Sequence, residues 1–146
     1  VLIGHGRVGR RVAEGLRAAH RPLVVIEDRL EEVEALRRDG IEALCGNGVT
    51  AGLLQDANIA QAERLVVAIP NVFEAGQAIE AARRLRPGLP VVARAHSDAE
   101  VKHLLAHGAN HVLMGEQEIA RGMLDWIAAP APEAPAAGGQ PAPLPA

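Results

Sequence analysis

The stretch of sequence that decides the fold is Val1-Leu2-Ile3-Gly4-His5-Gly6-Arg7-Val8-Gly9, at the start of the chain. An apolar run stops at Gly4, the pattern Gly-x-Gly-x-x-Gly follows without a gap, and apolar residues then recur at helical spacing. A strand, a tight glycine turn and a helix in this order are the context that a phosphate-binding fingerprint requires. Gly4 permits the sharp turn, Gly6 lets a phosphate approach the bare backbone, and Gly9 lets the helix lie close to the strand. We therefore predict that this turn binds an anion, with its free N–H groups and the positive end of the helix facing the ligand.

The helix predicted after this turn has an apolar stripe. Val8, Val12, Leu16 and Ala19 lie three or four positions apart, which places them on one side of a helix. The side chain of Arg7 has two interpretations: it folds over a bound phosphate, or it is a solvated surface residue.

A carboxylate follows the second predicted strand. Leu23-Val24-Val25-Ile26 is a continuous apolar run, and Glu27 ends it 18 residues beyond Gly9. A carboxylate at this point of a nucleotide-binding fold accepts hydrogen bonds from both hydroxyls of an adenosine ribose. The same charge disfavours a 2′-phosphate, so the sequence predicts an adenine nucleotide without a 2′-phosphate, and not NADP. Arg29 weakens that argument only slightly, and Glu27 and Asp28 are candidate ligand-binding residues.

Strand-like and helix-like patterns alternate regularly as far as residue 127. Short, continuous apolar runs are typical of buried parallel strands, and the segments between them have helical periodicity. This alternation predicts an α/β fold of the Rossmann type, a doubly wound parallel sheet of six strands in the order 3-2-1-4-5-6. The expected strands are residues 1–3, 22–26, 41–45, 65–69, 90–95 and 111–114.

The ligand crevice of such a fold lies at the carboxyl ends of the strands, where strands 1 and 4 diverge. Besides the glycine turn and Glu27-Asp28, we expect Gly46-Asn47 and Ile69-Pro70-Asn71 to line it. Asn47 has a donor and an acceptor, enough to recognise an adenine edge, although an asparagine between two glycines is also typical of a turn.

The composition excludes several classes of function. The formal net charge is −3, and the chain has one Phe, one Trp and no Tyr, so neither a basic surface nor an aromatic platform indicates nucleic-acid binding. The single cysteine, Cys45, ends a short apolar run and is predicted to be buried and unreactive. No triad, nucleophile elbow or pair of catalytic carboxylates can be assembled from the sequence.

Three histidines have a spacing that suggests a metal site. His103, His107 and His111 lie four residues apart. Gly108 is expected to end the helix before His111, and no thiol or carboxylate is obviously near, so we predict surface histidines and no metal.

Residues 1–127 resemble the RCK or Trk-N nucleotide-binding domain, which regulates potassium channels and transporters, and within it the cytosolic C-terminal domain of Kef-type monovalent cation:proton antiporters of the YbaL-like branch. The glycine fingerprint is generic, and the later runs are more specific. One departure is Gly46-Asn47, where many relatives have Gly-Asp. The runs that carry the resemblance are residues 4–9, Val25-Ile26-Glu27, Gly46-Asn47, Ala68-Ile69-Pro70-Asn71, Ala93-Arg94-Ala95-His96-Ser97-Asp98, Gly108-Ala109-Asn110 and Met114-Gly115-Glu116-Gln117-Glu118-Ile119-Ala120-Arg121.

The resemblance implies a regulatory module without chemistry of its own. Such a domain binds NAD(H) or an adenine nucleotide such as AMP, forms a homodimer and gates cation flux. The membrane antiporter domain would precede Val1 on the same polypeptide, and the module would lie at the cytoplasmic face of the inner membrane. The alternative is the NAD-binding half of a dehydrogenase, which would need a substrate domain and an acid–base residue at the nicotinamide.

The end of the chain has a different composition. The last predicted helix, residues 116–127, carries an apolar stripe of Ile119, Met123, Trp126 and Ile127, which we expect to contribute to a dimer contact even if part of it covers the sheet. Residues 128–146 are rich in proline and alanine with one charged residue, Glu133, and we predict a disordered tail or linker.

Overall fold

The computed structural model describes residues 1–130 of the chain, so that most of the predicted tail, residues 131–146, lies outside the described residues. The strands are β1 (Leu2–Ile3), β2 (Val24–Glu27), β3 (Glu42–Cys45), β4 (Leu65–Val67), β5 (Val91–Ala95) and β6 (His111–Met114). The helices are α1 (Arg7–Ala18), α2 (Leu30–Arg38), α3 (Ala51–Asp56), α4 (Val72–Leu85), α5 (Asp98–Ala106) and α6 (Gly115–Ala128).

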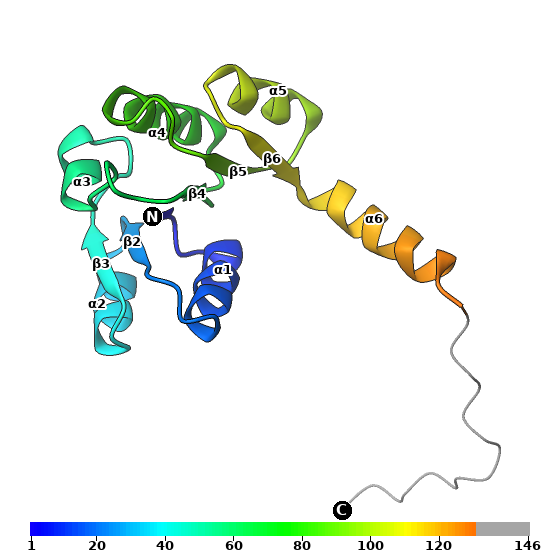
Figure 1. Cartoon of the computed structure of the whole chain (residues 1–146), viewed down its shortest axis with the longest axis horizontal. Helices are drawn as coiled ribbons and strands as arrows, with labels where there is room; N and C mark the ends of the chain where they lie inside the picture. Colours follow the sequence, from blue (N-terminus) through cyan, green and yellow to red (C-terminus); the bar gives the residue numbers. More distant parts are fainter. Residues whose placement is uncertain (131–146) are drawn as a thin grey trace, which may run out of the picture.

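The strands form one parallel sheet in the order β3-β2-β1-β4-β5-β6, which confirms the predicted Rossmann-type topology. The helices α1 and α2 lie on one face of this sheet, and α3, α4 and α5 lie on the other (Figure 1). Because every strand runs in the same direction, the carboxyl ends of all six strands meet at one edge of the sheet.

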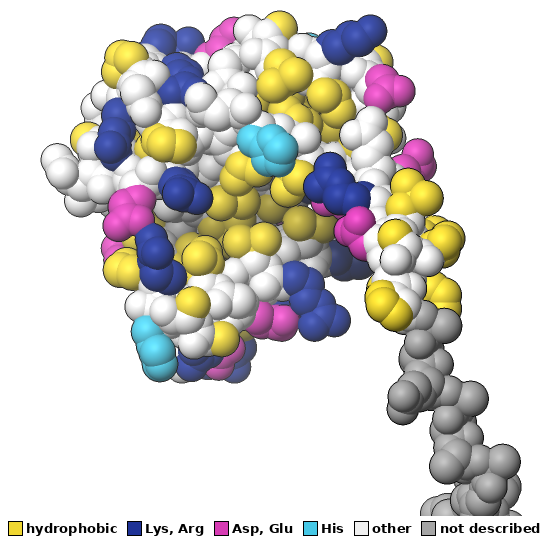
Figure 2. Space-filling view, turned by 45° about the vertical axis from the view of Figure 1, so that its right-hand side comes forward, with side chains coloured by type: hydrophobic (Ala, Val, Ile, Leu, Met, Phe, Trp, Pro, Cys, Tyr) yellow, Lys and Arg dark blue, Asp and Glu magenta, His cyan; other side chains and the backbone are white. Residues whose placement is uncertain are grey.

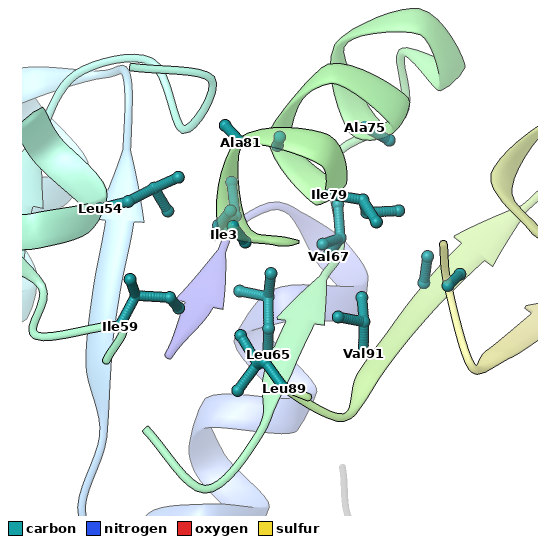
Figure 3. Close-up of a cluster of buried hydrophobic side chains, with 14 of the residues drawn as sticks. Ile3, Leu54, Ile59, Leu65, Val67, Ala75, Ile79, Ala81, Leu89 and Val91 are labelled. Carbon is teal, nitrogen blue, oxygen red and sulfur yellow. The ribbon is translucent and has the colours of Figure 1, made fainter. Parts of the chain in front are cut away.

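The larger core lies between the sheet and the helices α3, α4 and α5. Side chains of the central strands, such as Ile3, Leu65 and Val91, are at most 2% exposed and face Leu54 of α3 and Ile79 of α4 (Figure 3). Alanines on the buried side of α4 let that helix lie close to the strands. The core therefore fixes the strands whose ends carry the predicted site.

The residues that α1 buries against the sheet are not those of its apolar stripe. Its buried residues are Gly9 and Ala13, whereas Val12 and Leu16 are half-buried and Val8 and Ala19 are exposed. The apolar stripe is therefore only partly covered by the rest of the domain. The physical reason is the close approach of the helix to the turn after β1, which Gly9 permits and which brings the smallest residues of the helix against the sheet.

The helix α6 runs away from the body of the domain (Figure 1). None of its residues is buried, so the apolar stripe does not cover the sheet. Its large apolar side chains are 61% to 71% exposed, and they are Ile119, Met123, Leu124, Trp126 and Ile127. Within residues 1–130, no helix is long and apolar enough to cross a membrane.

Candidate functional site

The residues predicted to bind a ligand gather at the carboxyl edge of the sheet. The turn that begins at Gly4 follows β1, Glu27 is the last residue of β2, and Gly46 directly follows β3. Backbone hydrogen bonds hold these ends together: the N–H of Gly4 donates to the Ile26 carbonyl at 2.8 Å, and that of Gly46 donates to the Glu27 carbonyl at 2.9 Å. Ile69, beyond the end of β4, touches Gly4. The structure thus brings together the four predicted strand ends.

Two of the glycines in the turn are needed for its shape. Gly4 has φ of +92°, a left-handed conformation, and a Cβ atom there would lie 2.7 Å from Cγ2 of Ile69. At Gly9 a Cβ atom would lie 1.9 Å from the carbonyl oxygen of Gly4. Any larger residue at either position would therefore force the backbone apart.

Gly6 borders open space. Its backbone is extended, with φ of −74° and ψ of −161°, and a Cβ atom there would meet nothing within 4 Å. Gly6 is also the N-cap of α1, which has no side-chain cap and no acidic residue in its first turn. The N–H groups at a helix start carry a partial positive charge and attract anions. The open space beside Gly6 is therefore suited to a phosphate group.

The carboxylate of Glu27 is 6% exposed and holds the glycine turn in place. Its Oε2 accepts a hydrogen bond from the backbone N–H of His5 at 2.6 Å. Its Oε1 accepts two from Arg29, one from the backbone N–H at 3.2 Å and one from Nε at 2.9 Å. Burial by itself raises the pKa of Glu27, but the hydrogen bonds from His5, Asp28 and Arg29 outweigh it and bring that pKa to about 2. The hydrogen bond with Glu27 raises the pKa of Asp28 in turn.

A further carboxylate, which the sequence analysis did not identify, closes a ring of contacts around the turn. Glu32, in the first turn of α2, accepts a hydrogen bond from the His5 ring at 3.2 Å and two from Arg10 of α1 at 3.0 and 3.1 Å. The guanidinium of Arg29 lies 3.7 Å from the same carboxylate. The hydrogen bond from His5 is the main cause that lowers the pKa of Glu32. The ring Glu27–Arg29–Glu32–His5 therefore links α2 to the glycine turn.

Acid is expected to weaken this arrangement. The folded-state pKa of Glu27, about 2, lies below the ordinary value of 4.5, so its contribution to stability is complete above pH 4.5 and is lost as the pH falls toward 2. We expect Glu27→Gln to lower the free energy of unfolding by about 1–3 kcal/mol at pH 7, because charge-assisted hydrogen bonds contribute that much, and by less at pH 3. Urea denaturation at both pH values measures this. Glu14→Gln, at an exposed position of α1, is the control. If Glu27→Gln lowers the free energy of unfolding equally at both pH values, the lowered pKa of Glu27 is wrong.

The other predicted side chains lie at the edge of the site. Arg7 and Val8, in the first turn of α1, are both exposed. Asn47 uses its side-chain oxygen in a turn, where it accepts a hydrogen bond from the Val49 N–H at 3.0 Å. Asn71 caps α4 by accepting hydrogen bonds from the first backbone N–H groups of that helix, those of Phe73 and Glu74. The side-chain oxygens of both asparagines therefore accept hydrogen bonds from the local backbone, and their side-chain NH₂ groups remain as donors for a ligand.

The prediction that Cys45 is buried was wrong. Its side chain is exposed, with Sγ 3.7 Å from the Asp28 carbonyl oxygen. The reason is that β3 is an edge strand, and its last residue has a neighbouring strand on one side alone.

The histidines were predicted to lie at the surface, but His103 and His107 pack against α4, with their rings 4.0 Å apart and a buried His103 Nε2. His111, in β6, is exposed. Among the described residues, no three His, Cys, Asp or Glu side chains are placed to hold a metal ion.

A glycine turn at the start of a helix, beside a buried carboxylate on the neighbouring strand, is the arrangement of a dinucleotide-binding site. The family model of the TrkA-N domain matches residues 1–115, which include all of it. The chain belongs to the TrkA-N family. The resemblance predicted from the sequence motifs is thereby confirmed.

This TrkA-N domain is similar to parts of larger proteins. It is 43% identical over 130 residues to the putative cation/proton antiporter YbaL of Escherichia coli strain K12, a match that covers 89% of this chain and 23% of the relative. The chain therefore spans about a quarter of that relative's length. The crystal structure of the TrkA-N domain of the inner membrane protein YbaL from Escherichia coli matches with a TM-score of 0.82 and 44% identity, covering 86% of this chain and 93% of the other.

A more distant structure shares the fold and is described with a nucleotide. The Kef CTD of Shewanella denitrificans, in AMP bound form, matches this TrkA-N domain with a TM-score of 0.73 and 23% identity, over 88% of this chain and 80% of the other. At this identity the comparison establishes the common fold alone.

Proposed function

We propose that this TrkA-N domain is a regulatory module that binds AMP, NAD(H) or a related adenine nucleotide without a 2′-phosphate. One observation carries the proposal: the open space beside Gly6, at the uncapped start of α1, lies next to the buried carboxylate of Glu27. The first feature suits a phosphate and the second a ribose. The AMP-bound structure of the similar fold supports the same ligand class.

Binding, and not chemistry, is the proposed role. The buried carboxylate Glu27 and the His5 ring are both engaged in holding the turn, which leaves neither poised to transfer a proton. A ligand then acts by favouring one conformation of the domain over another. Since the similar YbaL is a putative cation/proton antiporter, we propose that this conformation gates cation movement through a membrane domain of the same polypeptide, from its cytoplasmic side.

The proposed module is also a homodimer, formed through α6. A groove of about 330 Å³ lies on the sheet face that also carries α1, and Figure 2 shows hydrophobic side chains collected in a hollow beside α6. Valines and alanines of β4 and β5 line it together with Val8 and Val12. Since α6 has an unburied apolar stripe and begins at the rim of this groove, a second copy's α6 is the occupant that we propose. In this dimer, α6 of each copy covers the apolar groove of the other copy.

The substitution Gly6→Val tests the binding site. A Cβ atom at this position meets nothing within 4 Å, so the side chain would enter the proposed phosphate space. We expect the melting temperature to fall only slightly, because valine is a poorer N-cap than glycine, and the binding of AMP and NADH to fall by at least about a hundredfold. Titration calorimetry with AMP, NADH and NADPH is the measurement. Gly15→Val is the control, because it adds the same side chain inside α1, at a position where a Cβ atom also meets nothing within 4 Å. Undiminished binding by Gly6→Val would place the ligand elsewhere.

The same pair of variants separates gating from mere binding. In vesicles that contain the full-length protein, cation flux should change by about five- to 150-fold on addition of nucleotide, which is the range of ordinary allosteric coupling. The Gly6→Val protein should lose this response, and the Gly15→Val protein should keep it. Flux that ignores both nucleotide and substitution would leave a binding module without the proposed regulatory role.

A further inference from the structure

The proposed ribose acceptor already has most of its hydrogen-bonding capacity in use. A carboxylate accepts about four hydrogen bonds. Glu27 accepts three from nitrogen donors, one from the backbone of His5 and two from Arg29, and the neighbouring Asp28 carboxyl adds a fourth only while it carries a proton. About one acceptor position therefore remains, whereas the two hydroxyls of an unmodified ribose would require two. One present partner of Glu27 must leave before such a ribose can bind fully.

The partners of Glu27 differ in how easily they can leave. The N–H of His5 belongs to the glycine turn, and the N–H of Arg29 belongs to the backbone that leads into α2. Releasing either would move the main chain. The third partner is the guanidinium of Arg29, at the end of a long side chain that is 56% exposed. It can leave Glu27 by rotation about side-chain bonds alone.

A second acceptor is already beside the guanidinium. The distance from Arg29 Nη1 to Oε1 of Glu32 is 3.7 Å, so the charge stays compensated when the bond from Nε to Glu27 breaks. Glu32 is in turn held by Arg10 and by the ring of His5. A small rotation is therefore enough to transfer Arg29 from the carboxylate of the ligand site to a carboxylate outside it.

We propose that Arg29 is a latch on the ribose position of this site, closed on Glu27 when the site is empty and displaced to Glu32 by a ribose that carries both hydroxyls. This inference rests on the nucleotide-binding function proposed above and adds a specificity-determining residue to it. A ribose with a single hydroxyl uses the free acceptor position and leaves the latch closed. A complete ribose gains a second hydrogen bond but loses the contact between Arg29 and Glu27, so the natural protein discriminates weakly between the two.

The experiment compares AMP with 2′-deoxy-AMP. Both ligands carry the same phosphate and base, so the ratio of their dissociation constants isolates the 2′-hydroxyl. In Arg29→Met the side chain keeps an unbranched apolar stem, loses the guanidinium and has no donor to place on Glu27. We expect AMP to bind several-fold more tightly to this variant, and the ratio of the two constants to rise about tenfold, since a hydrogen bond to a charged group has that effect.

Arg10→Met is the matched control. Arg10 is 53% exposed, nearly as much as Arg29, and it binds Glu32 without contacting Glu27. The control removes the same positive charge from the same network, and we expect the ratio of constants to stay at the natural value. A ratio that rises equally in both variants would show an effect of charge or of the network, and it would overturn the latch.

Two further outcomes test the latch and the proposed function separately. If the Arg29→Met protein binds AMP more weakly with an unchanged ratio, Arg29 contacts the ligand directly and the latch is wrong, while nucleotide binding stands. If the natural protein and Arg29→Met both fail to bind AMP or NADH in calorimetry although their melting curves are normal, the proposed function fails and the latch fails with it.

Discussion

Replacing Gly9 by alanine is expected to destabilise the domain by about 3 kcal/mol or more, an overpacking effect at the upper end of the usual range. The added Cβ atom would lie 1.9 Å from the carbonyl oxygen of Gly4 and 2.9 Å from its carbonyl carbon. Both are backbone atoms of the turn, so no side-chain rotation relieves the clash. The helix α1 must move away from β1, and the turn must open with it. We expect the melting temperature to fall by about 10 °C.

A substitution in the same helix supplies the control. Gly15 is exposed, and a Cβ atom there meets nothing within 4 Å. Gly15→Ala should therefore raise stability by about 0.5–1 kcal/mol, the ordinary gain from replacing a helical glycine. Thermal and urea melts of the two proteins make the comparison. If both alanines prove neutral or stabilising, the close packing of α1 on the turn is wrong.

The second large effect concerns assembly. With the natural sequence we expect a dimer, and with Trp126→Asp we expect monomers, because the substitution places a charge in the middle of the apolar stripe of α6. Light scattering at micromolar concentration measures the mass directly. The helix is unburied in a single copy, so the variant should keep the melting behaviour of an isolated domain.

The control for this experiment is Arg121→Gln. It changes the net charge by the same amount as Trp126→Asp, on a residue of α6 that hydrogen bonds to Glu118 and lies outside the apolar stripe. We expect this variant to remain a dimer. Natural protein that is already monomeric would refute the proposed assembly, and dissociation of the Arg121→Gln variant would mean that charge, and not the stripe, controls it.

Much of the fold could be predicted because its signals are local. The central parallel strands are buried on both sides and so appear as short apolar runs, and each crossover helix has its own periodicity. The position of Glu27 at the end of β2 follows from the same pattern, as does the left-handed turn at Gly4. These features depend on a few consecutive residues.

The partners of Glu27 could not be predicted in the same way. Glu32 looks like any acidic residue in the first turn of a helix, and it meets His5 only because the start of α2 lies next to the glycine turn in the folded domain. Arg29 was given a minor role because a sequence does not show whether a flexible side chain turns toward its neighbour. The error at Cys45 has a similar origin, since the position of a strand at the edge of a sheet depends on the complete topology.

The direct passage from β6 into α6 has a mechanical consequence. Met114 is both the last residue of the strand and the N-cap of the helix, so no loop separates them. A helix of 14 residues is about 21 Å long and behaves as a stiff rod anchored at one end. A rotation of about 10° at the edge of the sheet therefore displaces the far end of the rod by about 4 Å. The helix therefore amplifies a small rotation at the edge of the sheet into a displacement of several ångströms at its far end.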